Sequence, residues 1–215
     1  MSRDSEFNAS DAIELLDWKH SIFDLYAEIR RSEDSYSAWQ RWRVERDRLY
    51  RDHPQSPLTA SARKDFSGCS FFDYDASWRM LARIEDVEPA PLEIAVSTGA
   101  RFQFTRIGVA HFDLHGVEHE LELTWNEGYG GGLFLAFTDE TSGSTTYGGG
   151  RYLIDTVKGA DLGFDHDKGT ALLDFNFAYN PSCSYDPRWA CPLAPSANRL
   201  GLAVTAGEQL PRGSD

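Results

Sequence analysis

The first 58 residues place apolar side chains at helical spacing between polar ones. Residues 10–31 repeat apolar groups every three or four positions, and Ser10 with Asp11 is suited to cap this helix. A second helix is predicted from residue 34 or 35 to residue 50, and Pro54 lies just beyond its end. The apolar positions are Ile13, Leu16, Phe23 and Ile29 in the first helix and Trp39, Trp42, Val44 and Leu49 in the second. We expect residues 1–58 to form a helical segment that packs on the rest of the chain.

From residue 64 onward the pattern changes to short apolar runs that Gly, Asp and Pro interrupt. The predicted strands are 66–72, 78–84, 92–96, 101–107, 109–114, 117–125, 133–137, 151–154, 171–175 and 202–205. Many short strands with no helix between them favour a mainly β fold of the α+β class, an antiparallel β-sandwich or barrel preceded by the two helices. This β domain is expected to span residues 59–215.

One β-hairpin has a register that follows from its turn. A two-residue turn at His115-Gly116 predicts three cross-strand pairs: Leu114 with Val117, Phe112 with His119 and Ala110 with Leu121. Alternation then continues inward through Leu123 and Trp125, while the glutamates between them face water. His111, which on a helix would share a metal-binding face with the other two histidines, points outward here. We therefore interpret the three as surface and core residues.

The charge balance excludes several classes of partner. With 34 acidic and 21 basic residues, the net charge is −13, which disfavours nucleic acid and membrane surfaces as partners because both are negative. The bases are 17 Arg and 4 Lys. An acidic, Lys-poor surface suits a salt-loving source, and a GC-rich genome explains the same bias equally well. The mixed charges of residues 41–48 predict a solvated, salt-bridged helix face.

The chain is expected to be soluble and cytoplasmic. No apolar run is long enough to span a bilayer, and the N-terminal residues lack the apolar stretch of a signal peptide. The odd number of cysteines argues against a disulfide framework, so Cys69, Cys183 and Cys191 are interpreted as buried structural thiols. The segment 165–169 resembles the start of a calcium loop but lacks its later ligands, and a turn is the better interpretation. No metal or cofactor is expected, and no pattern indicates an oligomeric state.

Two polar segments, 138–153 and 173–200, stand out as a candidate binding site. Three glycines precede Arg151, whose guanidinium is suited to hold a carboxylate or phosphate. The predicted pocket for a small polar or anionic ligand is lined by Tyr147, Arg151, Asp174, Asn176, Tyr179 and Asn180. In this hypothesis Asp174 orients Arg151. The alternative is structural: Arg151 pairs with Asp174 or Asp139, and Asn176, Asn180 and Asn198 stabilise a long ordered loop.

Two further functions remain open from the residues alone. A hydrolase would use Asp174 or Glu208 as general base, and it requires one of these carboxylates to have a raised pKa in a cleft. A structural or protein-interaction domain would dock through the helix that carries Trp39 and Trp42. None of the catalytic signatures GxSxG, Walker loop, HExxH or the dinucleotide fingerprint is present.

The same segments carry a family resemblance. The blocks are SARKDFSGCSFFDYDASWRMLARIE at 61–85, DETSGSTTYGGGRYL at 139–153, LLDFNFAYNPSCSYDPRWACPLAPSANRL at 172–200 and AGE at 206–208. In this order they resemble the family called domain of unknown function 1684, over residues 36–210. The resemblance implies a β-rich fold and a prokaryotic source and supplies no activity. Long members of the family carry an additional N-terminal region, and this sequence resembles the short form.

Overall fold

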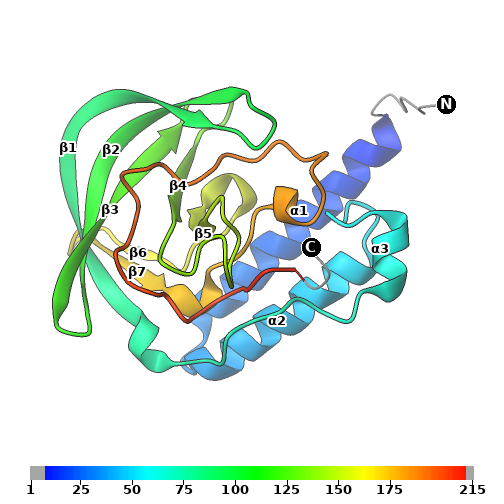
Figure 1. The fold of residues 1–215 in the computed structure, drawn as a ribbon, viewed down its shortest axis with the longest axis horizontal. Helices are drawn as coiled ribbons and strands as arrows, with labels where there is room; N and C mark the ends of the chain where they lie inside the picture. Colours follow the sequence, from blue (N-terminus) through cyan, green and yellow to red (C-terminus); the bar gives the residue numbers. More distant parts are fainter. Residues whose placement is uncertain (1–7, 212–215) are drawn as a thin grey trace.

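The structure, a computed structural model, describes residues 8–211 and joins a helical layer to a curved β-sheet (Figure 1). The α-helices are α1 (Ala9–Arg31), α2 (Ser35–Asp52) and α3 (Ala60–Asp65). The strands are β1 (Arg79–Ala95), β2 (Arg101–Leu114), β3 (Val117–Asn126), β4 (Gly132–Phe137), β5 (Arg151–Asp155), β6 (Phe164–Asp165) and β7 (Thr170–Asp174). Four single-turn 3₁₀ helices are η1 (Ala76–Trp78), η2 (Thr156–Lys158), η3 (Phe175–Phe177) and η4 (Ser182–Ser184).

The helix α1 begins one residue earlier than predicted, and only one of the four predicted apolar positions lies on its buried face. Asn8, not Ser10, caps it, in a capping box with Asp11. Its buried residues are Ile22, Leu25, Tyr26 and Ile29. Ile29 is buried as predicted, whereas Ile13, Leu16 and Phe23 are 68%, 51% and 41% exposed, because they lie outside the buried stripe of the helix.

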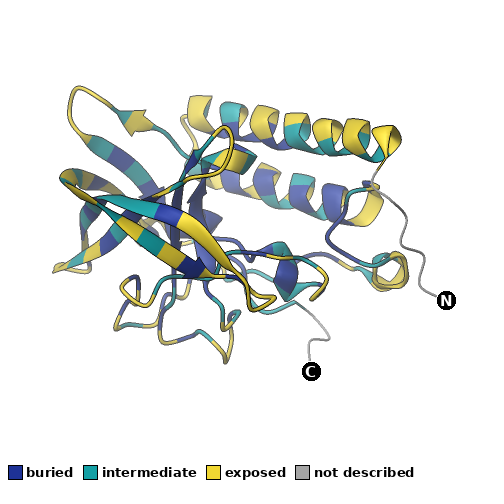
Figure 2. Ribbon diagram, turned by 90° about the horizontal axis from the view of Figure 1, so that it is seen from above, coloured by how far each residue is buried: buried dark blue, intermediate teal, exposed yellow. Residues whose placement is uncertain are grey.

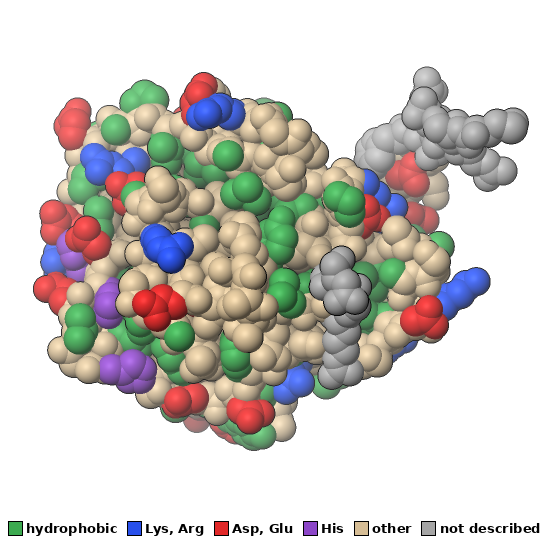
Figure 3. All heavy atoms as spheres, in the orientation of Figure 1, with side chains coloured by type: hydrophobic (Ala, Val, Ile, Leu, Met, Phe, Trp, Pro, Cys, Tyr) green, Lys and Arg blue, Asp and Glu red, His purple; other side chains and the backbone are tan. Residues whose placement is uncertain are grey.

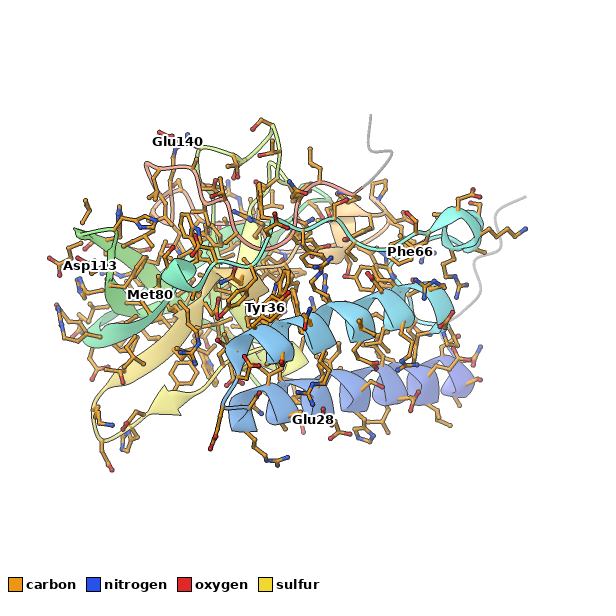
Figure 4. All side chains as sticks on the ribbon, turned by 90° about the horizontal axis from the view of Figure 1, so that it is seen from below. Glu28, Tyr36, Phe66, Met80, Asp113 and Glu140 are labelled. Atoms are coloured by element: carbon orange, nitrogen blue, oxygen red, sulfur yellow. The ribbon has the colours of Figure 1, made fainter. Side chains whose placement is uncertain are left out.

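The helix α2 confirms the predicted second helix, but the charged run 41–48 is not wholly solvated as predicted. Trp39, Trp42, Leu49 and Tyr50 are buried at the spacing of one helical face. Arg46, which belongs to the run predicted to be solvated, lies on that same face and is only 6% exposed. Val44 is exposed. Figure 4 shows α1 and α2 side by side, with Glu28 of α1 pointing away from the sheet, and Figure 2 shows their outer faces exposed.

The β-sheet confirms the mainly β, antiparallel, α+β prediction. Its seven strands have the order β5-β4-β3-β2-β1-β7-β6, and every pairing between them is antiparallel. The sheet does not close. Where a sandwich or barrel was predicted, the structure has one curved open sheet. One hydrophobic cluster joins the helices to Phe104, Phe134 and Tyr152. A second cluster, which includes Leu200 and Val204, lies beneath the C-terminal segment. The helices of residues 1–58 and the sheet thus share one core.

The strand β1 joins two segments that were predicted as separate strands. Its first part pairs with both β7 and β2, whereas Ala90–Ala95 pairs with β2 alone among the strands. The register shifts between Asp86 and Ala90, a stretch that contains Pro89, and Pro91 follows directly after it. Proline is tolerated here because this half of β1 needs hydrogen bonds on one side only. From the sequence, the prolines were interpreted as the end of one strand and the start of another. Periodicity alone does not reveal that one side of a strand is unpaired and can therefore accept proline.

The hairpin of β2 and β3 has the predicted register. Leu114 pairs with Val117, Phe112 with His119 and Ala110 with Leu121, and both turn residues have positive φ, as a type I′ turn requires. The inward alternation was wrong at Trp125, which is 39% exposed. A register shift between Arg106 and Gly108 changes the pairing, and Thr124 is buried instead.

Two other predicted strands are irregular segments, and the first of them pairs with residues 207–209. Residues 66–72 and 202–205 belong to no strand; Phe71 forms an isolated bridge with Glu208, and Gln209 N–H donates to Ser70 O. The predicted turn at 165–169 is confirmed, with Lys168 bound to Asp165 between β6 and β7. Between residues 8 and 211 no helix is long and apolar enough to cross a membrane. Acidic side chains and histidines gather at the edge formed by β1–β3 (Figure 3).

We expect two glycines with similar φ to respond differently to alanine. Gly207 has φ +78°, and a Cβ there would lie 2.6 Å from Phe175 O and 2.7 Å from Ala178 O. Gly116 has φ +82° and open space around it. Gly207→Ala should lower the free energy of unfolding by about 3 kcal/mol or more, and Gly116→Ala by about 1 kcal/mol. Urea unfolding measures both, and equal losses would contradict the packing of residues 175–178 against Gly207.

Candidate functional site

A large pocket lies between the helical layer and the loops that follow β5 and β7. Its volume is about 410 Å³, which is in the range of small-molecule sites. Six aromatic side chains line it: Trp18, Tyr26, Trp42, Tyr50, Tyr179 and Trp189. Two cations, Arg46 from α2 and Lys158 from η2, face the same space. The pocket therefore combines apolar walls with positive charge.

Arg46 is held at the pocket by aromatic rings and one carboxylate. Its guanidinium carbon lies 5.2, 4.8 and 4.9 Å from the ring centres of Trp42, Tyr50 and Tyr179. Its Nη2 donates to Tyr50 Oη at 2.7 Å and to Glu208 Oε2 at 2.8 Å. The charge of Glu208 keeps the pKa of Arg46 above its ordinary value although burial lowers it. Arg46 is therefore a permanent cation.

Glu208 is fully buried beside Arg46 and joins three segments of the chain. Its Oε2 also accepts the backbone N–H of Asn180 at 2.9 Å, and its Oε1 accepts the hydroxyl of Tyr185. Burial raises the pKa of Glu208, and Arg46 opposes this shift. Because both oxygens already accept hydrogen bonds, the carboxylate is a structural partner of Arg46.

Three polar atoms that line or adjoin the pocket are buried without a hydrogen-bond partner. They are Arg46 Nε, Tyr179 Oη and Asn180 Oδ1, each on a residue of the pocket wall. Asn180 uses its other amide atom, because Nδ2 donates to Gln209 O at 2.7 Å. A buried polar atom without a partner costs about 1–3 kcal/mol, so such atoms are rare unless a ligand or water completes them. Arg46 Nε is a donor, Tyr179 Oη can donate or accept, and Asn180 Oδ1 is an acceptor.

Lys158 supplies the second positive charge at the opposite wall. Its Nζ lies 3.2 Å from Asp155 Oδ2, and it stacks 5.6 Å from the ring centre of Tyr152. The attraction of Asp155 outweighs burial and raises the pKa of Lys158. Its side chain is 44% exposed, so this charge is accessible from solvent.

The structure separates the six residues that were predicted to form one pocket. Tyr179 and Asn180 line the large pocket, whereas Arg151 is 1% exposed and lies outside its lining. Arg151 Nη2 donates to Asp139 at 2.9 Å and to Val204 O at 3.0 Å, and Nη1 donates to Ala206 O. The guanidinium thus fixes the C-terminal segment against β5. Removing one partner of such a buried pair costs about 3–5 kcal/mol.

Asp174 does not orient Arg151, which corrects that part of the predicted site. Its Oδ2 lies 3.6 Å from Arg79 Nε, and its Oδ1 accepts two hydrogen bonds from Asn176. Burial raises the pKa of Asp174 to about 6, against the hydrogen bonds from Asn176 and the charge of Arg79. Together with Arg79, Asp174 lines a space of about 40 Å³, which is too small for a substrate.

The other asparagines and tyrosines have defined partners. Asn176 exchanges two hydrogen bonds with the backbone of Asp75, and Asn198 bonds the backbone of Glu122 and Ala136. Tyr147 Oη lies 3.5 Å from Cys183 Sγ. Asn176 and Asn198 therefore hold the irregular segments as the structural alternative predicted.

The tryptophans proposed as a docking face are inside the protein. Trp39 is 4% exposed and donates its indole N–H to Asn176 O, and Trp42 is 1% exposed and donates to Tyr26 Oη. They cannot contact a partner in this conformation. The three cysteines are buried and free, as expected. Within residues 8–211 there is no group of three His, Cys, Asp or Glu side chains that could hold a metal ion.

Comparison with known proteins places this arrangement in a family. The family model described as "Protein of unknown function (DUF1684)" matches residues 64–209, which is more than half of the chain. The chain belongs to the DUF1684 family. A similar solved structure is the solution NMR structure of an uncharacterized protein from Haloarcula marismortui. It is 34% identical, with a TM-score of 0.60, over 82% of this chain and 95% of that one. No curated protein matches the chain at a significant level.

The match to the DUF1684 family covers only part of the pocket. Tyr179, Asn180 and Glu208 lie inside the matched range, whereas Arg46 and the aromatic residues of α1 and α2 precede it. Sequence reasoning missed Arg46 because its neighbours at 41–48 are charged. The signal was its spacing: Trp39, Trp42, Arg46 and Leu49 follow one helical face.

For this DUF1684 protein we expect a pH-dependent gain in stability from Asp174→Asn. The pKa of Asp174 is about 6 in the folded protein, above its ordinary value of 3.8. The protonated side chain therefore contributes its full stability below pH 3.8, and this contribution is lost as the pH rises to about 6. Asp174→Asn has no ionisable group at this position, so its stability does not fall as the pH rises through this range. Relative to wild type, its free energy of unfolding should therefore rise by roughly 2–3 kcal/mol between pH 4 and pH 7. Urea unfolding of both proteins across this range measures the difference, and a pH-independent difference would contradict the raised pKa.

Proposed function

We propose that this protein binds a small amphipathic anion in the pocket between α1, α2 and the loop 179–191. The ligand class is an apolar, preferably aromatic body that carries one carboxylate, sulfonate or phosphate. The proposal keeps the small anionic ligand predicted from the sequence and replaces Arg151 by Arg46 and Lys158 as the cations that attract it.

The observation that carries the proposal is the set of unpartnered polar atoms on an otherwise aromatic wall. Arg46 Nε, Tyr179 Oη and Asn180 Oδ1 gain hydrogen bonds only if a ligand or water occupies the pocket. Arg46 Nε donates to an anionic oxygen, and Tyr179 Oη either donates to the same group or accepts from another one. Asn180 Oδ1 accepts from a ligand N–H or O–H.

The apolar part of the ligand is recognised by the rings. Trp18 and Tyr50 stack at 6.1 Å, and Ile22 and Ala160 add aliphatic surface. Burial of an apolar body contributes roughly 25 cal/mol per Å², so the rings supply affinity while the cations select the charged end. The net charge of −13 repels anions at long range, so recognition of the charged end depends on short-range contacts with Arg46 and Lys158.

Binding is better supported than hydrolysis. The hydrolase hypothesis needs Asp174 or Glu208 to reach a substrate, and both have a raised pKa. Glu208 has its oxygens occupied by Arg46, Asn180 and Tyr185, and Asp174 adjoins a space of water size. Glu208 therefore has no free oxygen for a substrate proton, and the space beside Asp174 does not admit a substrate.

The proposal also includes a cytoplasmic location, which the three free cysteines support. A salt-adapted source and a GC-rich genome both agree with the composition. The similar structure from the halophile Haloarcula marismortui supports the first.

Two lysines that each pair with an aspartate three residues earlier offer a matched test. Lys158 lines the pocket, and Lys168, which pairs with Asp165, lies outside its lining. We expect Lys158→Met to weaken binding of anilinonaphthalenesulfonate, an aromatic anion that fluoresces when bound, about tenfold, which is about 1.4 kcal/mol. Lys168→Met should bind as wild type does. Fluorescence titration measures all three proteins.

The uncharged N-phenylnaphthylamine separates the charge from the apolar body. It should bind wild type more weakly than the sulfonate and should bind wild type and Lys158→Met equally. Equal affinities for both probes in wild type, or no effect of Lys158→Met on the sulfonate, would overturn the proposed anion site.

The hydroxyl of Tyr179 gives a second, independent prediction. Tyr179→Phe removes an unpartnered buried hydroxyl, so the ligand-free variant should be more stable by about 1 kcal/mol, while its affinity for the sulfonate probe falls. Tyr152→Phe is the control, because its hydroxyl donates to Pro192 O and its loss should be destabilising. Thermal unfolding with and without probe measures both effects. A destabilised Tyr179→Phe would show that its hydroxyl is already satisfied in the free protein.

A further inference from the structure

Cys183 and Cys191 lie next to each other although seven residues separate them, and Cys191 belongs to the wall of the pocket. Cys183 belongs to η4, and Cys191 ends the loop that follows it and lines the pocket. Cys183 N–H donates to Cys191 Sγ at 3.3 Å, and Tyr147 Oη lies 3.5 Å from Cys183 Sγ. Both cysteines are free. The contact of the Cys183 backbone with Cys191 Sγ places the two cysteines next to each other.

The surroundings make these two thiols chemically different. The hydrogen bonds to Cys183 Sγ from Cys191 and from Tyr147 outweigh burial and lower the pKa of Cys183 to about 6. The pKa of Cys191 is raised by the same hydrogen bond, by burial and by the negative charge of Cys183. Cys69 is a contrast within the same chain, because burial and the nearby Glu208 raise its pKa. The lowered pKa of Cys183 favours its thiolate, and the raised pKa of Cys191 favours its thiol.

We propose that Cys183 and Cys191 form a redox-active dithiol, in which Cys183 reacts with a small hydroperoxide and Cys191 then closes an intramolecular disulfide. In the first step the Cys183 thiolate attacks one oxygen of the hydroperoxide and an S–O bond forms. The O–O bond breaks, and the leaving alkoxide takes a proton from solvent to become an alcohol. Cys183 is oxidised to a sulfenic acid.

In the second step Cys191 loses its proton and its sulfur attacks the sulfur of Cys183. The S–S bond forms, the S–O bond breaks, and hydroxide leaves with that proton as water. In total, two electrons from the two thiols reduce one hydroperoxide to one alcohol and one water. A dithiol reductant returns the pair to its starting state by thiol–disulfide exchange.

The order of the two steps is built into the site. While Cys183 is an anion, its charge keeps Cys191 protonated. When Cys183 becomes an uncharged sulfenic acid, that charge disappears, and Lys158, which lowers the pKa of Cys191, then favours its thiolate. Cys191 is thus activated only after Cys183 has reacted.

The disulfide would also affect the pocket, a consequence that rests on the proposed binding function. It would tie together both ends of the segment 184–190, which carries Trp189 of the aromatic wall. The loop would then lose freedom to move away from a ligand. The redox chemistry itself needs no ligand, so it is tested separately.

The experiment treats the full-length protein with one equivalent of hydrogen peroxide at pH 7, alkylates the remaining thiols and maps the peptides by mass spectrometry. We expect a Cys183–Cys191 disulfide that forms at least tenfold faster than free cysteine is oxidised, while Cys69 stays alkylated. In Cys191→Ser, dimedone should trap a sulfenic acid at Cys183. In Cys183→Ser, Cys191 should not react at this dose, and Cys69→Ser should behave as wild type.

Tyr147→Phe tests the environment without removing a sulfur. Loss of its hydrogen bond should raise the pH midpoint of the Cys183 reaction and slow the reaction at pH 7, with the same disulfide as product. The proposal is overturned if the three cysteines are oxidised at similar rates, if no disulfide joins Cys183 to Cys191, or if Cys191→Ser yields no dimedone adduct. These outcomes leave the binding of the sulfonate probe to reduced protein unaffected, so the two proposals fail separately.

Discussion

The buried ion pair of Arg46 and Glu208 connects two parts of this protein that are 162 positions apart in the sequence. It joins α2 to the C-terminal segment, and the same carboxylate holds the backbone of Asn180 and the hydroxyl of Tyr185. Two buried charges are stable only where each has a close partner and further hydrogen bonds. Arg46 meets this condition while its Nε remains unpartnered toward the pocket. The contact between Arg46 and Glu208 therefore supports both the stability of the fold and the positive charge in the pocket wall.

The blocks that identify the family converge around two such ion pairs. Arg151, which pairs with Asp139, donates to the carbonyls of Val204 and Ala206, and Arg46 donates to Glu208 in the same segment. The polar density of 138–153 and 173–200 thus reflects the need to fix a C-terminal segment without regular structure over one face of the sheet. The pocket is built where the segment 179–191 meets the helices, and so it uses residues from both parts of the chain.

The sequence predicts local features of this fold better than contacts between distant segments. The hairpin register at His115-Gly116 was correct because turn geometry determines it, and both long helices were correct in extent to within a few residues. Arg46 was assigned to solvent because its partner lies 162 positions away in the sequence. For the same reason, the partner of Arg151 was left open between Asp139 and Asp174, and only Tyr179 and Asn180 of the predicted pocket line the observed one.

The prolines of β1 have a consequence for the behaviour of the protein at high concentration. The second half of β1 pairs with β2 on one side, and a sheet edge of this kind is a template on which other chains can add strands. Pro89 and Pro91 offer no N–H to an incoming strand, the register shift twists the edge, and Leu193 N–H takes the carbonyl of Ala95 at its end. The prolines and the register shift, which made β1 look like two separate strands in the sequence, thus protect the protein against edge-to-edge aggregation.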